Sequence, residues 1–119
     1  MHFDLTPEQQ ALRHAARDFM RRECPPEVIR QALAEGRHSA TLWRRMAELG
    51  WLGVAIDERY GGSGGDILDM AILMEELSRG EPAIGPYFTT VCFGGKSIVT
   101  NEQCRNIIAQ LRCELPRSY

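Results

Sequence analysis

The most apolar stretch of the chain, residues 66–78, is hydrophobic on nearly every side when it is wound as a helix. Its apolar residues spread around the helix instead of following one stripe: Ile67, Leu68, Met70, Ala71, Ile72, Leu73, Met74 and Leu77. Asp66 can cap the first turn, and Gly80 is a suitable stop. The stretch is far shorter than the roughly 20 apolar residues that span a bilayer. We therefore predict a buried central helix over residues 66–78, covered by the other segments.

Apolar stripes at helical spacing predict further helices before and after the central one. The sequence Thr6-Pro7-Glu8-Gln9 has the features of a capped helix start, and Pro25-Pro26 ends the stripe that follows. These signals predict a helix over residues 7–23. Shorter amphipathic patterns predict helices over 26–35, 41–49, 87–99 and 101–111.

One apolar stretch, Trp51–Ile56, lacks a helical pattern and follows Gly50, which we predict to be a left-handed helix stop. It is interrupted by a glycine and has no partner strand in the sequence, so we predict an extended buried connector. The predicted fold class is therefore all-α, a bundle of five to six helices around the buried central helix at residues 66–78.

The composition argues against some classes of function, but it does not identify the function. The chain has 119 residues, enough for one domain, and its net charge is −2, which gives no argument for nucleic acid or an anionic membrane. The N-terminus shows no secretory signal pattern. The four cysteines have neither a C-x-x-C pair nor zinc spacing, so we predict free thiols in a reducing cytoplasm: Cys24, Cys92, Cys104 and Cys113.

Two glycine-containing segments resemble phosphate-binding loops. Gly61–Gly65 precedes the central helix, and amide groups at a helix start can bind anions. No strand leads into it, so a structural turn with positive φ is the favoured interpretation. Gly94–Ser97 resembles the end of a P-loop, but Thr90 stands where the first glycine belongs. Close helix packing through small residues is favoured there.

The remaining polar residues form no catalytic group in the sequence. His2, His14 and His38 are isolated, and we predict them at the surface, with no metal site. The adjacent Glu75 and Glu76 would point about 100° apart on a helix, so they do not form a carboxylate dyad. We expect one or both to pair with an arginine of segment 7–23 or 41–49.

Five stretches, in order and in spacing, resemble the N-terminal helical domain of the acyl-CoA dehydrogenase family. They are residues 3–13, 43–54, 58–64, 74–79 and 100–104. The third resembles the family's P-E-x-Y-G-G-x-G loop, with Asp57 where proline is usual. The resemblance implies a domain over residues 1–112, followed by an unmatched tail over 113–119. It implies that the chain is a fragment or domain of a flavin-dependent enzyme. This domain would form one wall of the cleft that holds the acyl chain and the flavin.

In that family the whole enzyme removes the α-proton of an acyl-CoA with a carboxylate and passes the β-hydride to FAD. The resemblance places the flavin-binding β-barrel and the catalytic glutamate in further domains. It therefore implies no catalytic residue in this chain, no assigned cofactor-binding residue, and FAD that this chain alone does not hold. By resemblance, Tyr87, Thr90 and Val91 line the substrate cleft.

The same resemblance implies acyl-CoA as the substrate of the full-length protein and an apolar face that contacts either a second copy or a partner subunit. Taken alone, the chain is expected to be inactive. Two other classes stay open: a non-catalytic interaction subunit that docks a separate barrel-containing partner, and a P-loop nucleotide-binding protein built on Gly94–Ser97.

Overall fold

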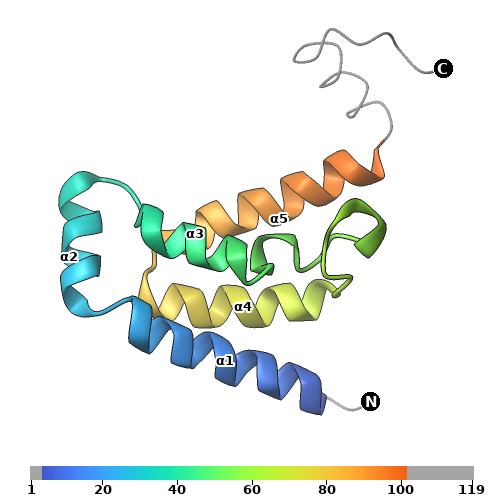
Figure 1. The fold of residues 1–119 in the computed structure, drawn as a ribbon, viewed down its shortest axis with the longest axis horizontal. Coiled ribbons are helices and arrows are strands. Elements are labelled where there is room, and N and C mark those ends of the chain that lie inside the picture. Colours follow the sequence, from blue (N-terminus) through green and yellow to red (C-terminus); the bar gives the residue numbers. More distant parts are fainter. Residues whose placement is uncertain (1–3, 102–119) are drawn as a thin grey trace, which may run out of the picture.

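The computed structural model describes residues 4–101, and within them the chain is all-helical, as predicted (Figure 1). The elements are five α-helices and two short 3₁₀ turns: α1 (Pro7–Glu23), α2 (Pro26–Glu35), α3 (Ala40–Glu48), η1 (Trp51–Gly53), η2 (Glu58–Tyr60), α4 (Ile67–Gly80) and α5 (Ile84–Thr100). The predicted helix over 101–111 and the tail over 113–119 lie outside the described residues.

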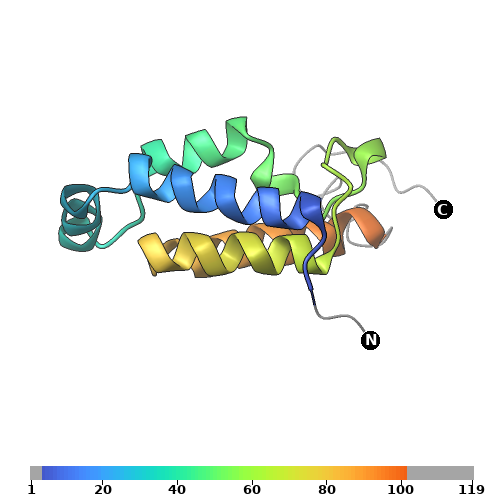
Figure 2. The same ribbon diagram turned by 90° about the horizontal axis from the view of Figure 1, so that it is seen from below.

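Helix α4 occupies the centre of the fold. It runs between α1 and α5, and α3 lies on one side of this row, while α2 stands apart at one end (Figures 1 and 2). Asp66 caps α4 by accepting hydrogen bonds from the amides of Leu68 and Asp69 at 2.8 and 3.0 Å, and the Asp69 carboxylate accepts one from the Asp66 amide at 2.9 Å. This reciprocal cap fixes where the helix begins.

The middle of α4 is buried, but its first turn is not. Met70, Ile72, Leu73 and Leu77 are in the core, whereas Ile67 is 55% exposed and Leu68 is exposed as well. The prediction of a helix covered on all sides is therefore wrong for these two residues. An apolar residue indicates that burial would be favourable, but the side chain is buried only where a neighbouring helix covers it. None of the described helices covers the first turn of α4.

The core is formed where α1, α3, α4 and α5 face one another. Phe19 of α1 packs edge-on against Trp51, with ring centroids 4.9 Å apart. Other buried side chains come from each surrounding helix, among them Ala16, Leu42, Met46, Ile84 and Phe88. Burial of such side chains contributes on the order of 2 kcal/mol each, so this cluster accounts for most of the driving force for folding.

The segment after α3 differs from the extended connector that we predicted. Gly50 has the expected left-handed conformation, with φ of 75°, but Trp51–Gly53 then forms a 3₁₀ turn. Val54 and Ile56 donate backbone hydrogen bonds to Trp51 and Gly53 at 3.1 Å each. Without a partner strand, these local bonds are the available way to satisfy the buried backbone. The burial itself was predicted correctly, because Trp51, Val54 and Ala55 are all in the core.

Helix α5 begins at Ile84, three residues earlier than predicted. Pro86 lies in its first turn, where a missing N–H breaks no helical hydrogen bond, so the proline does not delay the helix. The glycine pair Gly94-Gly95 is inside α5, as expected.

Candidate functional site

A groove of about 620 Å³ runs along the outside of the α4–α5 pair. Its α4 side is formed by Ala71, Met74, Glu75, Ser78 and Arg79, and its α5 side by Gly85, Pro86 and Thr89. Thr89 donates a hydrogen bond from Oγ1 to the Met74 sulfur at 2.9 Å. The two helices approach closely at one end, where a Cβ on Gly85 would collide with the Ser78 hydroxyl. The groove is therefore a shallow, mostly apolar channel with its charged groups at the rim.

The three residues predicted to line a cleft lie on the outward side of α5. Tyr87 is 46% exposed, Val91 is 38% exposed, and Thr90 is exposed with its hydroxyl donating to the Pro86 carbonyl at 2.8 Å. Spacings of three and four residues place them on one face of the helix. Ile98 extends the exposed apolar surface toward the helix end, whereas the exposed Phe93 lies on the other side of the helix, nearer the groove. We call Tyr87, Val91 and Ile98 the α5 surface; the cleft role of its residues stays a prediction.

Sequence reasoning missed the groove residues of α4 and Thr89. A signal was present, because Ala71, Met74 and Ser78 recur at three- and four-residue spacing on one side of the central helix. It was hidden by the apolar residues on the other sides of the same helix. Only the position of α5 decides which stripe of α4 borders the groove.

The glycine loop Gly61–Gly65 is a structural turn, as favoured from the sequence. Gly61 and Gly64 have positive φ, 85° and 70°. All five amides of the loop donate to backbone carbonyls of residues 53–58, at 2.7–3.2 Å. Amides that are already used in this way cannot cradle a phosphate, so the phosphate-binding alternative is wrong for this loop.

The segment Gly94–Ser97 is part of the continuous helix α5. A P-loop requires a loop that wraps a phosphate ahead of a helix, so the structure excludes the P-loop alternative here. Gly95 instead faces the connector, because a Cβ on it would lie 3.2 Å from Ile56 Cδ1. This is the close packing that the sequence favoured.

The acidic pair on α4 is neutralised by arginines of α1, as expected for one of the two helices considered. Arg17 binds Glu76 through two hydrogen bonds, Nε to Oε2 at 3.0 Å and Nη2 to Oε1 at 2.7 Å. The Arg17 hydrogen bonds outweigh the desolvation of the buried carboxylate, so the pKa of Glu76 is lowered. Glu75 pairs with Arg79 at 2.8 Å and lies 3.7 Å from Arg13. The Arg17–Glu76 pair joins α1 to α4, the Glu75–Arg79 pair lies within α4, and both acids at this position are paired.

A second carboxyl group is buried where α4 ends. Glu81 is 2% exposed, and neither of its oxygens accepts a hydrogen bond of standard geometry from the described residues. Loss of solvation raises its pKa, and the Ser39 backbone N–H and the His38 imidazole oppose that change. The Cys24 thiol at the end of α1 is also affected, since burial first and Glu81 second raise its pKa.

His38 contradicts the prediction that the histidines are isolated surface residues, whereas His14 is exposed as predicted and His2 lies outside the described residues. The His38 ring lies 4.4 Å from the Tyr87 ring and 5.1 Å from the Trp43 ring, centroid to centroid. Its Nδ1 is buried without a hydrogen-bond partner among the described residues. The turn between α2 and α3 carries it there, which no local sequence signal indicates.

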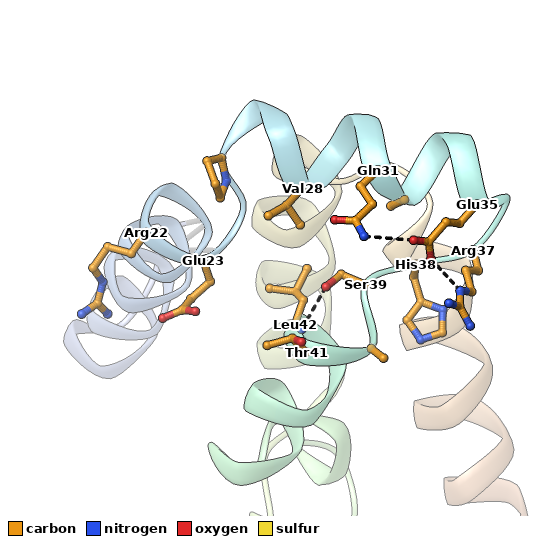
Figure 3. A pocket seen from close by; sticks show the side chains of 13 residues that line it. Arg22, Glu23, Val28, Gln31, Glu35, Arg37, His38, Ser39, Thr41 and Leu42 are labelled. Carbon is orange, nitrogen blue, oxygen red and sulfur yellow. Dashed lines mark hydrogen bonds and ion pairs between the residues drawn. The ribbon is translucent and has the colours of Figure 1, made fainter.

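Figure 3 shows a cavity of about 520 Å³ beside this turn, between the end of α1, α2 and the start of α3. Glu35 accepts hydrogen bonds there from Gln31 and Arg37 at 3.0 and 2.8 Å, and Ser39 caps α3 by accepting from the Leu42 amide. Glu35, Gln31 and Arg37 satisfy one another, and the His38 imidazole also lines the cavity, which is a polar surface hollow without an assembled catalytic group.

Other chemistry is limited within residues 4–101. Cys24 and Cys92 are buried free thiols, as predicted, while Cys104 and Cys113 lie outside the described residues. The described part of the chain contains no cluster of three or more potential metal ligands. Nor does that part contain a helix with the length and hydropathy needed to cross a membrane.

Comparisons with known proteins point to one family. The family model described as "Acyl-CoA dehydrogenase, N-terminal domain" matches residues 6–110. The chain is 35% identical over 101 residues to "Probable acyl-CoA dehydrogenase YngJ" of Bacillus subtilis, a match that covers 82% of this chain and 26% of that protein. It is 34% identical over 79 residues to the short-chain specific acyl-CoA dehydrogenase of Clostridium acetobutylicum, a match that covers 66% of this chain and 21% of that protein. It is also 37% identical over 79 residues to the acryloyl-CoA reductase (NADH) of Anaerotignum propionicum, a match that covers 66% of this chain and 20% of that protein. The chain therefore spans about a quarter or less of the length of these relatives.

Proposed function

Because this chain belongs to the acyl-CoA dehydrogenase family, whose N-terminal domain it carries, we propose that it walls the acyl-chain side of a flavin-dependent cleft. The reaction of the complete protein would be α,β-dehydrogenation of an acyl-CoA thioester. The role of this domain is to bind the acyl chain and exclude water, and the chemistry takes place on groups that other domains supply.

The observation that carries this proposal is the exposed apolar side of α5 together with the α4–α5 groove beside it. Tyr87, Val91 and Ile98 are exposed together on one side of α5, and apolar side chains gathered in this way are typical of a contact surface. An acyl chain or an apolar domain laid on that side would remove these side chains from water. The predicted lining residues Tyr87, Thr90 and Val91 are exposed on α5 and do not line the groove itself, so their contact with an acyl chain is part of the proposal.

FAD would supply the hydride acceptor of this reaction. The glycine loop does not fit its phosphates, because the amides of Gly61–Gly65 are all occupied by backbone carbonyls. We therefore propose that the phosphates are held by a flavin-binding domain, in agreement with the family resemblance. On this proposal the chain alone does not dehydrogenate acyl-CoA.

A domain exchange tests the proposal. Residues 1–112 would replace the matching segment of the Bacillus relative, and dehydrogenation of acyl-CoAs of increasing chain length would be measured with an artificial electron acceptor. We expect a yellow, active chimera whose preferred chain length differs from that of the parent and shifts on Tyr87→Ala. A folded, flavin-loaded chimera whose chain-length profile is that of the parent and is indifferent to Tyr87→Ala would contradict the cleft role.

A second candidate is a non-catalytic subunit that uses the α5 surface to bind a separate partner or a second copy. The same exposed side chains favour it, since an apolar surface of this kind is typical of protein contacts. Size-exclusion chromatography with light scattering distinguishes the two: association that is lost on Val91→Asp supports a docking role. A monomer at all concentrations removes self-association from consideration.

We also propose a cytoplasmic location, because a reducing compartment suits the free thiols Cys24 and Cys92. Cell fractionation followed by immunodetection tests this.

A further inference from the structure

The apolar groove between α4 and α5 continues past Ala71 and Thr89, toward the start of α4 and the end of α5. Ile67 precedes Ala71 by four positions on α4, and Phe93 follows Thr89 by four positions on α5. Residues four apart share one side of a helix. Ile67 is 55% exposed and Phe93 is 47% exposed. The two side chains therefore form an uncovered apolar extension of the groove, which we call the groove extension.

Two contacts between the helices show that these side chains lie near the same level of the helix pair. A Cβ on Gly85 would collide with the Ser78 hydroxyl, and Thr89 donates a hydrogen bond to Met74. The helices run antiparallel (Figure 1), so each step back along α4 matches one step forward along α5. Continued to the start of α4, this register places the two side chains of the groove extension within about 4.5 Å of each other along the helix axis.

The groove opens on the face of the α4–α5 layer that points away from the other helices. Among the described residues, none of those that line the groove comes from α1, α2 or α3. In Figure 2, α1 and α3 lie on the other side of this layer. A cover for the groove extension must therefore come from residues outside 4–101 or from another molecule.

The chain itself provides a candidate cover, because it continues directly from the end of α5. This helix ends at Thr100, and Asn101 is extended, with φ of −112° and ψ of 109°, so the chain leaves the helix axis there. The family model continues to residue 110, which indicates that the segment after α5 belongs to the same domain. A tethered segment also has an effective concentration in the millimolar range, which favours it over a separate partner.

The sequence after α5 has an apolar side of suitable position and length. Residues 101–111 are predicted to form a helix, with Ile107, Ile108 and Leu111 on one side. Phe93 lies seven residues before Thr100, about 10 Å back along α5. A helix that begins at residue 102 and returns beside α5 reaches residue 107 after about 8 Å and residue 111 after about 14 Å. Its apolar residues therefore arrive at the level of the groove extension.

We propose that residues 102–111 fold back as a helix and cover the groove extension, with the apolar side of the segment against Ile67 and Phe93. The contact removes both apolar surfaces from water at once, in the manner of an amphipathic helix in a groove. It leaves the α5 surface, on the other side of the same helix, free for the cleft role. The proposal does not rest on that role.

Disulfide trapping in the 119-residue chain tests the proposal. Cys104 shares the apolar side of the segment, since it precedes Ile107 by three residues and Ile108 by four. One turn before Ile108, it should lie level with Ile67. A disulfide forms only where the two Cα atoms approach within about 7 Å. Ile67→Cys would be combined with Cys113→Ser, oxidised with copper phenanthroline, and analysed by peptide mass spectrometry without reduction. We expect position 67 to be joined to Cys104 in most chains.

The matched control is Leu33→Cys in the same background, at a 71% exposed position on α2. It should give no bond to Cys104. The oxidation would be repeated with a mixture of chains labelled with nitrogen-14 and nitrogen-15. Bonds between differently labelled chains would mean that a second copy covers the groove extension, and they would overturn the proposal. Failure of Ile67→Cys to bond to Cys104, or equal bonding by Leu33→Cys, would overturn it as well.

A second measurement requires no bond to form. Ile108→Asp places a charge on the apolar side of the segment, so it should release the cover and raise the fluorescence of added anilinonaphthalene sulfonate by about twofold or more. The δ-methyl NMR signal of Ile67 should shift in the same variant. Asn106→Asp, on the other side of the segment, should change neither signal. Equal responses of the two variants would contradict the contact. Failure of the cleft role would appear separately, as a chimera indifferent to Tyr87→Ala.

Discussion

Arg17 holds Glu76 through two hydrogen bonds of 3.0 and 2.7 Å, and this contact joins α1 to the centre of the fold. The residues are 59 positions apart in the sequence, and the carboxylate end is almost fully buried, with Glu76 2% exposed. A buried carboxylate that keeps its charge requires such a partner, and the two-pronged guanidinium geometry suits it.

Replacing Arg17 should weaken the fold in a pH-dependent way. Arg17→Gln leaves a buried charge with a poorer partner, so we expect the free energy of unfolding at pH 7 to fall by about 2 kcal/mol. Because the folded-state pKa of Glu76 is lowered, the contribution of the pair is present above the unfolded pKa and is lost as the pH falls through the folded one. Urea unfolding between pH 7 and pH 3 measures this.

The control for that experiment is Arg21→Gln. Arg21 lies on the same helix and makes an exposed pair with Asp18 at 3.8 Å, so its replacement should change stability by less than about 0.5 kcal/mol. Equal effects of the two substitutions at pH 7, or a loss in Arg17→Gln that persists undiminished at pH 3, would contradict the role given to the Arg17–Glu76 pair.

Two glycines provide a matched test of the backbone packing. A Cβ on Gly62 would collide with the backbone carbonyl of Ile56, whereas a Cβ on Gly94 meets nothing within 4 Å. We expect Gly62→Ala to destabilise the chain by about 3 kcal/mol. Gly94→Ala should stabilise it by up to about 1 kcal/mol, since alanine is the better helix former. The free energy of unfolding of each variant would be measured by denaturant unfolding under the same conditions. Similar free energies for the two variants would refute the packing argument.

The thiol of Cys92 should be unreactive in the folded protein. It is buried, it donates to the Leu52 carbonyl at 3.6 Å, and burial raises its pKa to about 11. The thiolate is the reactive form and is scarce at pH 8 under these conditions. Iodoacetamide followed by peptide mass spectrometry should find Cys92 unmodified in buffer and fully modified in urea.

An engineered cysteine on the same helix is the comparison for Cys92. Thr90→Cys places a thiol on the exposed side of α5 and should be modified in buffer within minutes. Modification of Cys92 at a comparable rate would show that α5 opens readily from the core.

The sequence predicted those elements whose signals are local. The capping residues and the apolar stripe gave the exact bounds of α1, 7–23, and the prolines and Gly36 gave those of α2, 26–35. The Gly50 stop was also predicted, because positive φ at a helix end is a property of one residue and its neighbours.

The features that the sequence did not reveal depend on segments far apart in the chain. His38 is placed against Tyr87 by the packing of the turn before α3 on α5, and Glu81 is buried at the end of α4 although no local pattern predicts it. The alternation of polar and apolar residues says which side of a helix prefers to be covered. It does not say which neighbour covers it, and for that reason the exposure of Ile67 and the burial of Glu81 were both missed.

The α5 surface should tolerate a charge in the free domain but not in the assembled cleft. Val91 is 38% exposed, so Val91→Asp should change the free energy of unfolding of the chain by less than about 0.5 kcal/mol. In the chimera it should lower acyl-CoA dehydrogenation at least about tenfold, because a carboxylate would be placed in an apolar contact at a cost of several kcal/mol. Steady-state rates at saturating and limiting acyl-CoA measure this.

The matched control for Val91 is Leu33→Asp on α2, a side chain that is 71% exposed and belongs to the helix that stands apart from α5. It should leave both stability and turnover unchanged. Equal activity of the two variants would mean that the α5 surface faces solvent in the assembled enzyme.

The five amides of Gly61–Gly65, all bound to carbonyls of residues 53–58, give a glycine-rich segment the opposite of its usual mechanical character. A string of glycines normally acts as a hinge, yet here its motion would require several backbone bonds to break together. We therefore expect the link between α3 and α4 to be stiff, to resist proteases and to exchange its amide hydrogens slowly with solvent. Because α4 packs against α5, this link also restrains the helix that borders the groove.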